Sequence, residues 1–175
     1  DAADKLLPKI RERIAVLKVG SGLDPASQMG PLITRTHLDK VTSYVEQGVR
    51  EGANLLVDGR ALKVAGHERG FFLGPCLFDN VTPAMSIYQD EIFGPVLSTV
   101  RAKHYDEALG LIHRHRYANG VAIFTNDGGA ARKFQSEVQV GMVGVNVPIP
   151  VPMAYYSFGG WKQSLFGDLH IYGRD

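Results

Sequence analysis

This sequence of 175 residues contains a single cysteine, Cys76, which excludes an internal disulfide framework and is compatible with a reducing compartment. Its longest apolar runs are only strand-sized, so no transmembrane helix is expected. The chain also has no large excess of positive or negative charge, because 19 Lys and Arg residues are balanced by 18 Asp and Glu residues. Without a basic stripe, we expect neither nucleic acid nor an anionic membrane as the main partner.

The two ends of the sequence indicate a piece of a longer chain. Asp1 lies inside an amphipathic helical pattern that is too charged for a secretory signal peptide, and residues 172–175 bring no closing element. Hydrophobic residues make up 45% of the chain, an ordinary share for a globular protein. The length suits one domain with a buried core.

Two helices are expected in the first third of the chain. Apolar residues recur at helical spacing in residues 1–17, where Pro8 predicts a separate or irregular first turn. A second helix is expected from about residues 34–36 to residue 51, with Gly52 as its C-terminal stop. Its buried stripe is predicted to consist of Leu38, Val41, Val45 and Val49.

Short apolar strands and further helices alternate through the rest of the chain. We expect helices at residues 106–115 and 127–138, the second of them capped by Asp127. Strands are expected at residues 54–57, 71–81, 96–100, 121–125 and 142–145, with Gly74-Pro75 interrupting the second of these and the fourth buried. This alternation predicts an α/β fold with an open, largely parallel sheet and flanking helices.

The densest cluster of informative residues is Asp90–Val96. Glu91 could accept hydrogen bonds from two adjacent ribose hydroxyls, as an acidic residue does in dinucleotide sites, and Phe93 could pack against a ring. The simpler interpretation is a solvated turn with one exposed acid and one core aromatic, because single acids before turns are common. The residues alone favour that simpler interpretation.

Cys76 raises the alternative of a thiol nucleophile with a histidine as its base. Its neighbours Gly74, Pro75, Leu77 and Phe78 are apolar or strand-like, whereas a reactive cysteine needs a positive, partly exposed setting. A buried structural thiol is therefore the preferred interpretation. No metal site is expected, since no cluster of residues reaches the ligand count of a zinc centre.

Asn146 follows an apolar strand, where ligand sites lie in open α/β sheets. Its amide could orient a substrate or a neighbouring loop. It could equally satisfy the backbone of its own turn, and the sequence leaves these two alternatives open.

Several ordered motifs together resemble the aldehyde dehydrogenase superfamily over nearly the whole length. Residues 29–32 look like the family's segment before a long helix, and residues 51–53 match its "EGA". Residues 90–96 match "EEIFGPV" with Asp for the first Glu, and residues 158–162 match "FGGxK". Residues 143–152 look like the "VGVNVPIPVP" stretch of the methylmalonate-semialdehyde branch.

The resemblance implies an NAD-dependent reaction with coenzyme A as co-substrate. In that family a cysteine attacks the aldehyde, hydride passes to NAD, and the resulting thioester is transferred to coenzyme A. Malonate or methylmalonate semialdehyde would also lose carbon dioxide, in valine or inositol catabolism. A homo-oligomeric parent is implied, in the cytoplasm of a bacterium or the mitochondrial matrix of a eukaryote.

The resemblance also assigns roles to individual residues. Glu91 and Phe93 match the acid and the aromatic at the nicotinamide ribose, and Phe158 matches the aromatic that lines the substrate entrance. We expect Asn146, from its place after a strand, to lie in the substrate pocket as well. Cys76 does not match the nucleophile. We therefore expect residues 1–175 to be part of a catalytic domain, with the nucleophile and the Rossmann domain upstream and no activity in the isolated chain. A non-catalytic assembly module and another aldehyde dehydrogenase subfamily remain alternatives.

Overall fold

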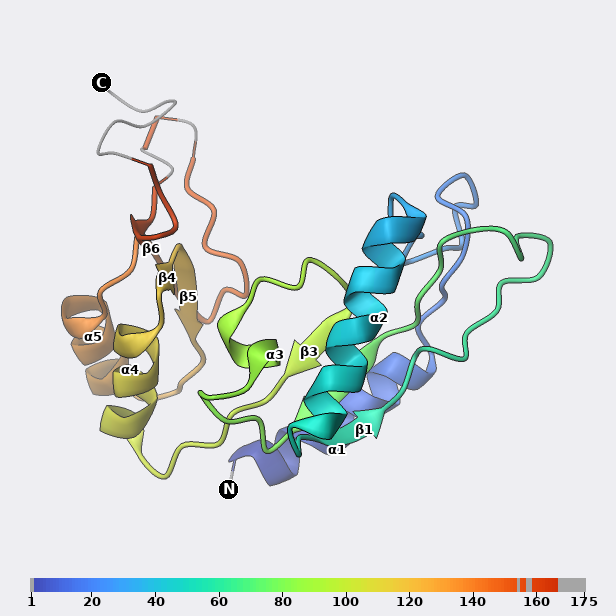
Figure 1. Ribbon diagram of the computed structural model, residues 1–175. Coiled ribbons are helices and arrows are strands. Elements are labelled where there is room, and N and C mark those ends of the chain that lie inside the picture. Colours follow the sequence, from blue (N-terminus) through green and yellow to red (C-terminus); the bar gives the residue numbers. More distant parts are fainter. Residues whose placement is uncertain (1, 154, 157–158, 167–175) are drawn as a thin grey trace. The chain divides into compact units, whose positions relative to one another are not determined.

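The computed structural model describes residues 2–153, 155–156 and 159–166 of the chain (Figure 1). Its helices and strands alternate in the α/β manner that the sequence predicts. The chain divides into two compact units, Asp1–Arg101 and Ala102–Asp175, each of which has its own strand pairing and its own hydrophobic core.

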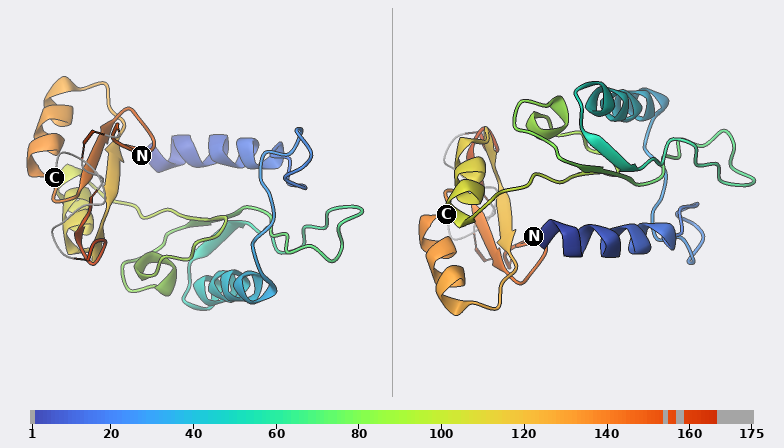
Figure 2. Two further views of the ribbon diagram at one scale, coloured as in Figure 1. Left: turned by 90° about the horizontal axis from the view of Figure 1, so that it is seen from above. Right: turned by 90° about the horizontal axis from the view of Figure 1, so that it is seen from below.

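The first unit is built on a three-stranded sheet with the order β1-β2-β3. β2 (Cys76–Asp79) pairs antiparallel with β1 (Asn54–Val57) and parallel with β3 (Val96–Ser98). Helix α1 (Ala2–Ala15) covers one face of this sheet, and α2 (Arg35–Arg50) and α3 (Ser86–Gln89) cover the other (Figure 2). Because it is covered on both faces, β2 is buried at every position.

Helix α2 carries the main apolar face of the first unit. Leu38, Val41 and Val45 are buried as predicted, but Val49 is 45% exposed and Gly48 is buried instead. A Cβ atom at Gly48 would lie 2.8 Å from the Cδ1 atom of Ile87 and 3.1 Å from the ring of Phe78. The absence of a side chain therefore lets the helix approach the sheet closely, which the hydrophobic pattern could not predict.

The ends of α2 follow the expected chemistry. Its N-cap Thr34 accepts a hydrogen bond at Oγ1 from the backbone N–H of His37, and Gly52, with φ +95°, ends the helix.

The irregular first turn expected at Pro8 is wrong, because α1 runs continuously through this residue. A proline at this point removes one intrahelical hydrogen bond, and the helix continues on both sides. The predicted strand over residues 71–81 is confined to β2, after the Gly74-Pro75 interruption.

The second unit contains two small sheets within the described residues. β5 (Gly120–Ile123) pairs parallel with β6 (Met142–Val145), and β4 (Tyr117–Ala118) pairs antiparallel with β7 (Trp161–Lys162). Helices α4 (Tyr105–Arg114) and α5 (Gly128–Glu137) complete it. The expectation that the strand at residues 121–125 is buried is wrong, because β5 has a single strand partner here and its side chains are half-exposed.

The cap of α5 is confirmed. Asp127 accepts hydrogen bonds from the backbone N–H groups of Gly129 and Ala130 at 2.7 and 3.2 Å. The core that α5 covers contains Ala118, Phe134, Val138 and Val140.

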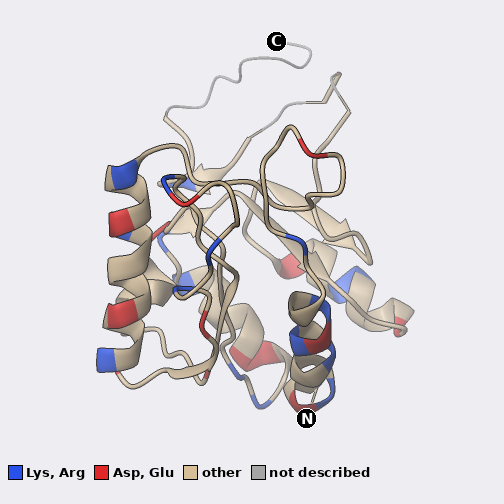
Figure 3. Ribbon diagram, turned by 90° about the vertical axis from the view of Figure 1, so that its right-hand side faces the viewer, with Lys and Arg blue, Asp and Glu red and all other residues tan. Residues whose placement is uncertain are grey.

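Acidic and basic residues are interspersed along α1 and α2 (Figure 3). No helix in the described part of the chain has the length and the hydropathy needed to cross a bilayer.

Candidate functional site

The turn between α3 and β3 presents Glu91 and Phe93 at the surface of the first unit. Ile92 between them is 8% exposed and belongs to the core, whereas the Phe93 side chain is 76% exposed. Phe93 adopts φ +59°, the left-handed region that L residues with a Cβ rarely adopt. The prediction of a core aromatic here is therefore wrong: Ile92 is the buried anchor, and the aromatic ring faces outward.

Helix α2 holds this turn at three points along one face. The Tyr44 hydroxyl donates to Oδ2 of Asp90 at 3.0 Å, and Nε2 of His37 lies 2.7 Å from the carbonyl oxygen of Phe93. Between these two contacts, a Cβ atom at Gly94 would lie 2.6 Å from Cγ1 of Val41. Positions 37, 41 and 44 recur at helical spacing, so one rigid element fixes the whole turn.

Glu91 is exposed, and the described residues provide no hydrogen bond or ion pair to its carboxylate. An ionised carboxylate only accepts hydrogen bonds, so two adjacent hydroxyls of a sugar would satisfy it. A large exposed aromatic next to it supplies an apolar surface for a ring. The turn thus combines the two groups that would bind a ribose and the ring attached to it.

Asn146 follows β6 and adopts φ +56°. Its side chain binds the backbone of Thr125, accepting from the N–H at 2.9 Å and donating to the carbonyl at 3.1 Å. This two-way contact joins the chain segments that follow β5 and β6. Thr125 is 21 positions away in the sequence, so the amide orients a neighbouring loop, as the first alternative allowed, rather than satisfying the backbone of its own turn.

Residues 159–164 are attached to the rest of the second unit through Lys162. Its Nζ atom donates to the carbonyls of His113 and His115 at 2.6 and 2.9 Å, at the C-terminal end of α4. An ammonium group there satisfies carbonyls without intrahelical partners and complements the helix dipole. The Ser164 hydroxyl oxygen also accepts a hydrogen bond from the Ala118 N–H at 2.8 Å. Phe158, the residue expected in the substrate pocket, lies outside the described residues.

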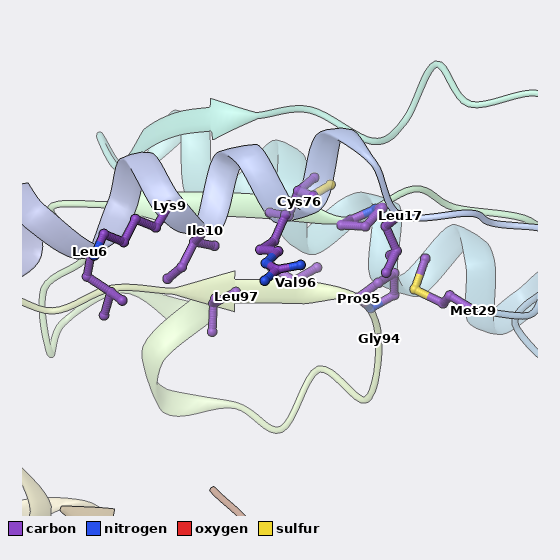
Figure 4. Close-up of a pocket in the computed structure, with 13 residues that line it drawn as sticks. Leu6, Lys9, Ile10, Leu17, Met29, Cys76, Gly94, Pro95, Val96 and Leu97 are labelled. Carbon is purple, nitrogen blue, oxygen red and sulfur yellow. The ribbon is translucent and has the colours of Figure 1, made fainter. Parts of the chain in front are cut away.

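A cavity of about 540 Å³ lies between α1 and the strands β2 and β3 (Figure 4). Its lining is apolar except for Lys9 and Arg13 and includes Cys76. The Cys76 side chain is 1% exposed, and burial raises the pKa of its thiol. Because burial disfavours the thiolate and the lining contains no histidine to act as a base, the structure disfavours a nucleophilic role for Cys76.

No group of three His, Cys, Asp or Glu side chains in the described ranges lies close enough together to hold a metal ion. The Glu91–Phe93 turn is therefore the candidate site.

The model of the aldehyde dehydrogenase family matches residues 1–174. This chain belongs to the aldehyde dehydrogenase family. A malonate-semialdehyde dehydrogenase of Pseudomonas aeruginosa is 60% identical to it over 173 residues, which cover 99% of this chain and 35% of that aldehyde dehydrogenase.

Solved aldehyde dehydrogenase structures share the fold. A putative methylmalonate-semialdehyde dehydrogenase from Sinorhizobium meliloti, complexed with NAD, superposes with a TM-score of 0.96 at 54% identity. The superposition covers 98% of this chain and 35% of the Sinorhizobium meliloti chain. A betaine aldehyde dehydrogenase from Staphylococcus aureus in complex with NAD⁺ gives a TM-score of 0.91 at 31% identity, over 98% of this chain and 33% of that one. The chain thus spans about a third of the length of these aldehyde dehydrogenases.

Proposed function

We propose that this chain forms the C-terminal part of the catalytic domain of an NAD-dependent semialdehyde dehydrogenase and supplies the surface that faces the nicotinamide ribose. The observation that carries the proposal is the outward presentation of Glu91 and Phe93 on one turn fixed by α2. Family membership and the NAD complexes of similar proteins support it.

Each residue of the turn has a defined task in this proposal. The Glu91 carboxylate accepts hydrogen bonds from the two ribose hydroxyls and so fixes the rotation of the sugar. The Phe93 ring packs against the sugar and limits its movement. When bound, NAD accepts the hydride from the substrate. Rigid positioning matters because hydride transfer depends on the orientation of the reacting groups.

For the full-length enzyme we propose oxidation of malonate or methylmalonate semialdehyde with coenzyme A as the acyl acceptor. One aldehyde, one coenzyme A and one NAD would yield acetyl-CoA or propionyl-CoA, carbon dioxide and NADH. The names of the similar proteins support the substrate class, and the stretch at residues 143–152 resembles that branch of the family. Phe158 and Asn146 belong to the substrate side of this proposal, Asn146 by holding the loop at Thr125.

We further propose that this chain is inactive by itself. Cys76, its single cysteine, is buried with a raised thiol pKa, so the nucleophile has to come from another part of the full-length enzyme. NADH formation from malonate semialdehyde and coenzyme A by the chain alone would contradict this.

The test of the proposed function is NADH formation by the full-length enzyme, with identification of the CoA ester by mass spectrometry. Glu91→Gln should raise the KM for NAD by about tenfold, because charge-assisted hydrogen bonds are roughly twice as strong as neutral ones. The matched control is Glu46→Gln, on the exposed surface of α2 with a 3.9 Å ion pair to Arg50, which should leave the KM unchanged. Equal values for both variants would refute the role of Glu91.

A further inference from the structure

We infer that His37 is a positioning residue that holds the Glu91–Phe93 turn in its ligand-facing conformation. The inference rests on the proposed function only in taking the nicotinamide ribose of NAD as the ligand of the turn. The contact itself is a hydrogen bond of 2.7 Å between Nε2 of His37 and the carbonyl oxygen of Phe93, residues that are 56 positions apart in the sequence.

The acceptor determines which nitrogen of the imidazole carries the hydrogen of this bond. A carbonyl oxygen only accepts, so the hydrogen of this bond is on Nε2 of His37. The His37 side chain is half-exposed and lies in the first turn of α2. The Oγ1 atom of Thr34 accepts a hydrogen bond from the backbone N–H of His37 at 3.1 Å. This cap fixes the backbone position from which the imidazole ring reaches the turn.

The bond is made at the strained residue. Phe93 has φ +59°, and a side chain with a Cβ in that region persists only when its surroundings hold it there. A hydrogen bond to its carbonyl opposes rotation of the Phe93–Gly94 peptide. Gly94 follows, packed against Val41 without room for a side chain.

Loss of the His37–Phe93 hydrogen bond should change the conformation of the turn more than it lowers the stability of the protein. Ile92 remains in the core at 8% exposure, and the Cys76 N–H still donates to the Pro95 carbonyl at 2.8 Å. Both sides of the turn thus stay attached, while the peptide after Phe93 becomes free to rotate. Rotation there would redirect the Phe93 ring and the backbone beside Glu91 away from the cofactor.

The first experiment compares two cofactors in the full-length enzyme: NAD and an analogue that lacks one hydroxyl of the nicotinamide ribose. His37→Ala should raise the KM for NAD on the order of fivefold, the factor that corresponds to one hydrogen bond. It should affect the analogue much less, because the analogue has already lost part of the contact to Glu91. His37→Gln, whose amide can donate to the same carbonyl, should restore the wild-type KM.

The control variant Thr36→Ala changes an exposed neighbour on the same helical turn and should behave as the wild type. A merely structural role of His37 would weaken both cofactors equally, and that result, or no change for either cofactor, would overturn the inference.

The second experiment measures hydrogen exchange of residues 90–96 without cofactor. His37→Ala should accelerate exchange in that segment and leave β1 and β2 unchanged, while His37→Gln and Thr36→Ala should match the wild type. Unchanged exchange in residues 90–96, or faster exchange throughout the first unit, would overturn the positioning role. If the wild type does not discriminate between the cofactors, the ribose-binding role of Glu91 fails, and the exchange result still decides whether His37 holds the turn.

Discussion

Arg101 binds the carboxylate of Asp79 through two hydrogen bonds, from Nε to Oδ1 at 3.0 Å and from Nη2 to Oδ2 at 2.8 Å. Asp79 is the last residue of β2 and only 5% exposed. The same guanidinium donates from Nη1 to Oδ1 of Asp4 in α1 at 2.7 Å. One side chain therefore ties the helix on one face of the sheet to the end of the central strand, using the fork geometry that arginine provides.

Arg101→Met should lower the free energy of unfolding by about 2 kcal/mol, because it leaves a buried carboxylate without its partner. Urea denaturation measures the loss. Arg60→Met is the matched control: Arg60 also binds a carboxylate, that of Asp58, with two atoms, but that pair is two residues apart and partly exposed. We expect its removal to change stability by about 0.5 kcal/mol or less. Equal losses in the two variants would contradict the role of Arg101.

The same contact predicts a dependence of stability on pH. Hydrogen bonds from Arg101 hold the pKa of Asp79 below its ordinary value of 3.8. Since the pKa is lower in the folded state, the stabilisation is present above the unfolded pKa and is lost as the pH falls through the folded pKa. Unfolding free energies measured from about pH 6 down to about pH 2 should therefore fall more steeply for the wild type than for Arg101→Met. Parallel curves would rule this contribution out.

Gly94→Ala should destabilise the protein by about 1–3 kcal/mol, the usual effect of overpacking, and should also raise the KM for NAD. The new Cβ atom would lie 2.6 and 2.8 Å from the two methyl groups of Val41, pushing the turn away from α2. Gly22→Ala is the control, because a Cβ atom there meets nothing within 4 Å. Adding Val41→Ala to Gly94→Ala should recover part of the loss, and strictly additive effects would argue against this contact.

Cys76 should resist alkylation by iodoacetamide near neutral pH in the folded protein and react once the protein is unfolded in urea. Its thiol is buried, its pKa is raised by that burial, and its sulfur accepts a hydrogen bond from the Gly59 N–H at 3.3 Å. Intact-mass measurement over time follows the reaction. Rapid modification of the folded protein would revive the thiol-nucleophile alternative.

The sequence predicted those features that depend on local patterns. The helical spacing of Leu38, Val41 and Val45 identified the buried face of α2, and Asp127 identified the start of α5, because periodicity and capping are properties of neighbouring residues. The motif at residues 90–96 pointed to Glu91 and Phe93 through its resemblance to a family. The residues alone favoured a core aromatic and did not predict that the Phe93 ring is exposed, because exposure depends on the left-handed backbone.

The contacts that hold the site in place could not be predicted, because they join residues far apart in the chain. Nothing in the sequence around His37 indicates a bond to Phe93, and nothing around Tyr44 indicates Asp90. Likewise, Gly48 is buried where the pattern favoured Val49, because the fit of α2 against Phe78 and Ile87 requires the smaller residue. The two-residue strands β4 and β7 are too short for any periodic signal.

The most direct test of the central proposal is a crystal structure of the full-length enzyme with NAD bound. The proposal predicts that both hydroxyls of the nicotinamide ribose lie within about 3 Å of the Glu91 carboxylate, with the Phe93 ring against the sugar and the His37–Phe93 hydrogen bond intact. A bound NAD whose nicotinamide ribose makes no contact with Glu91 or Phe93 would contradict it.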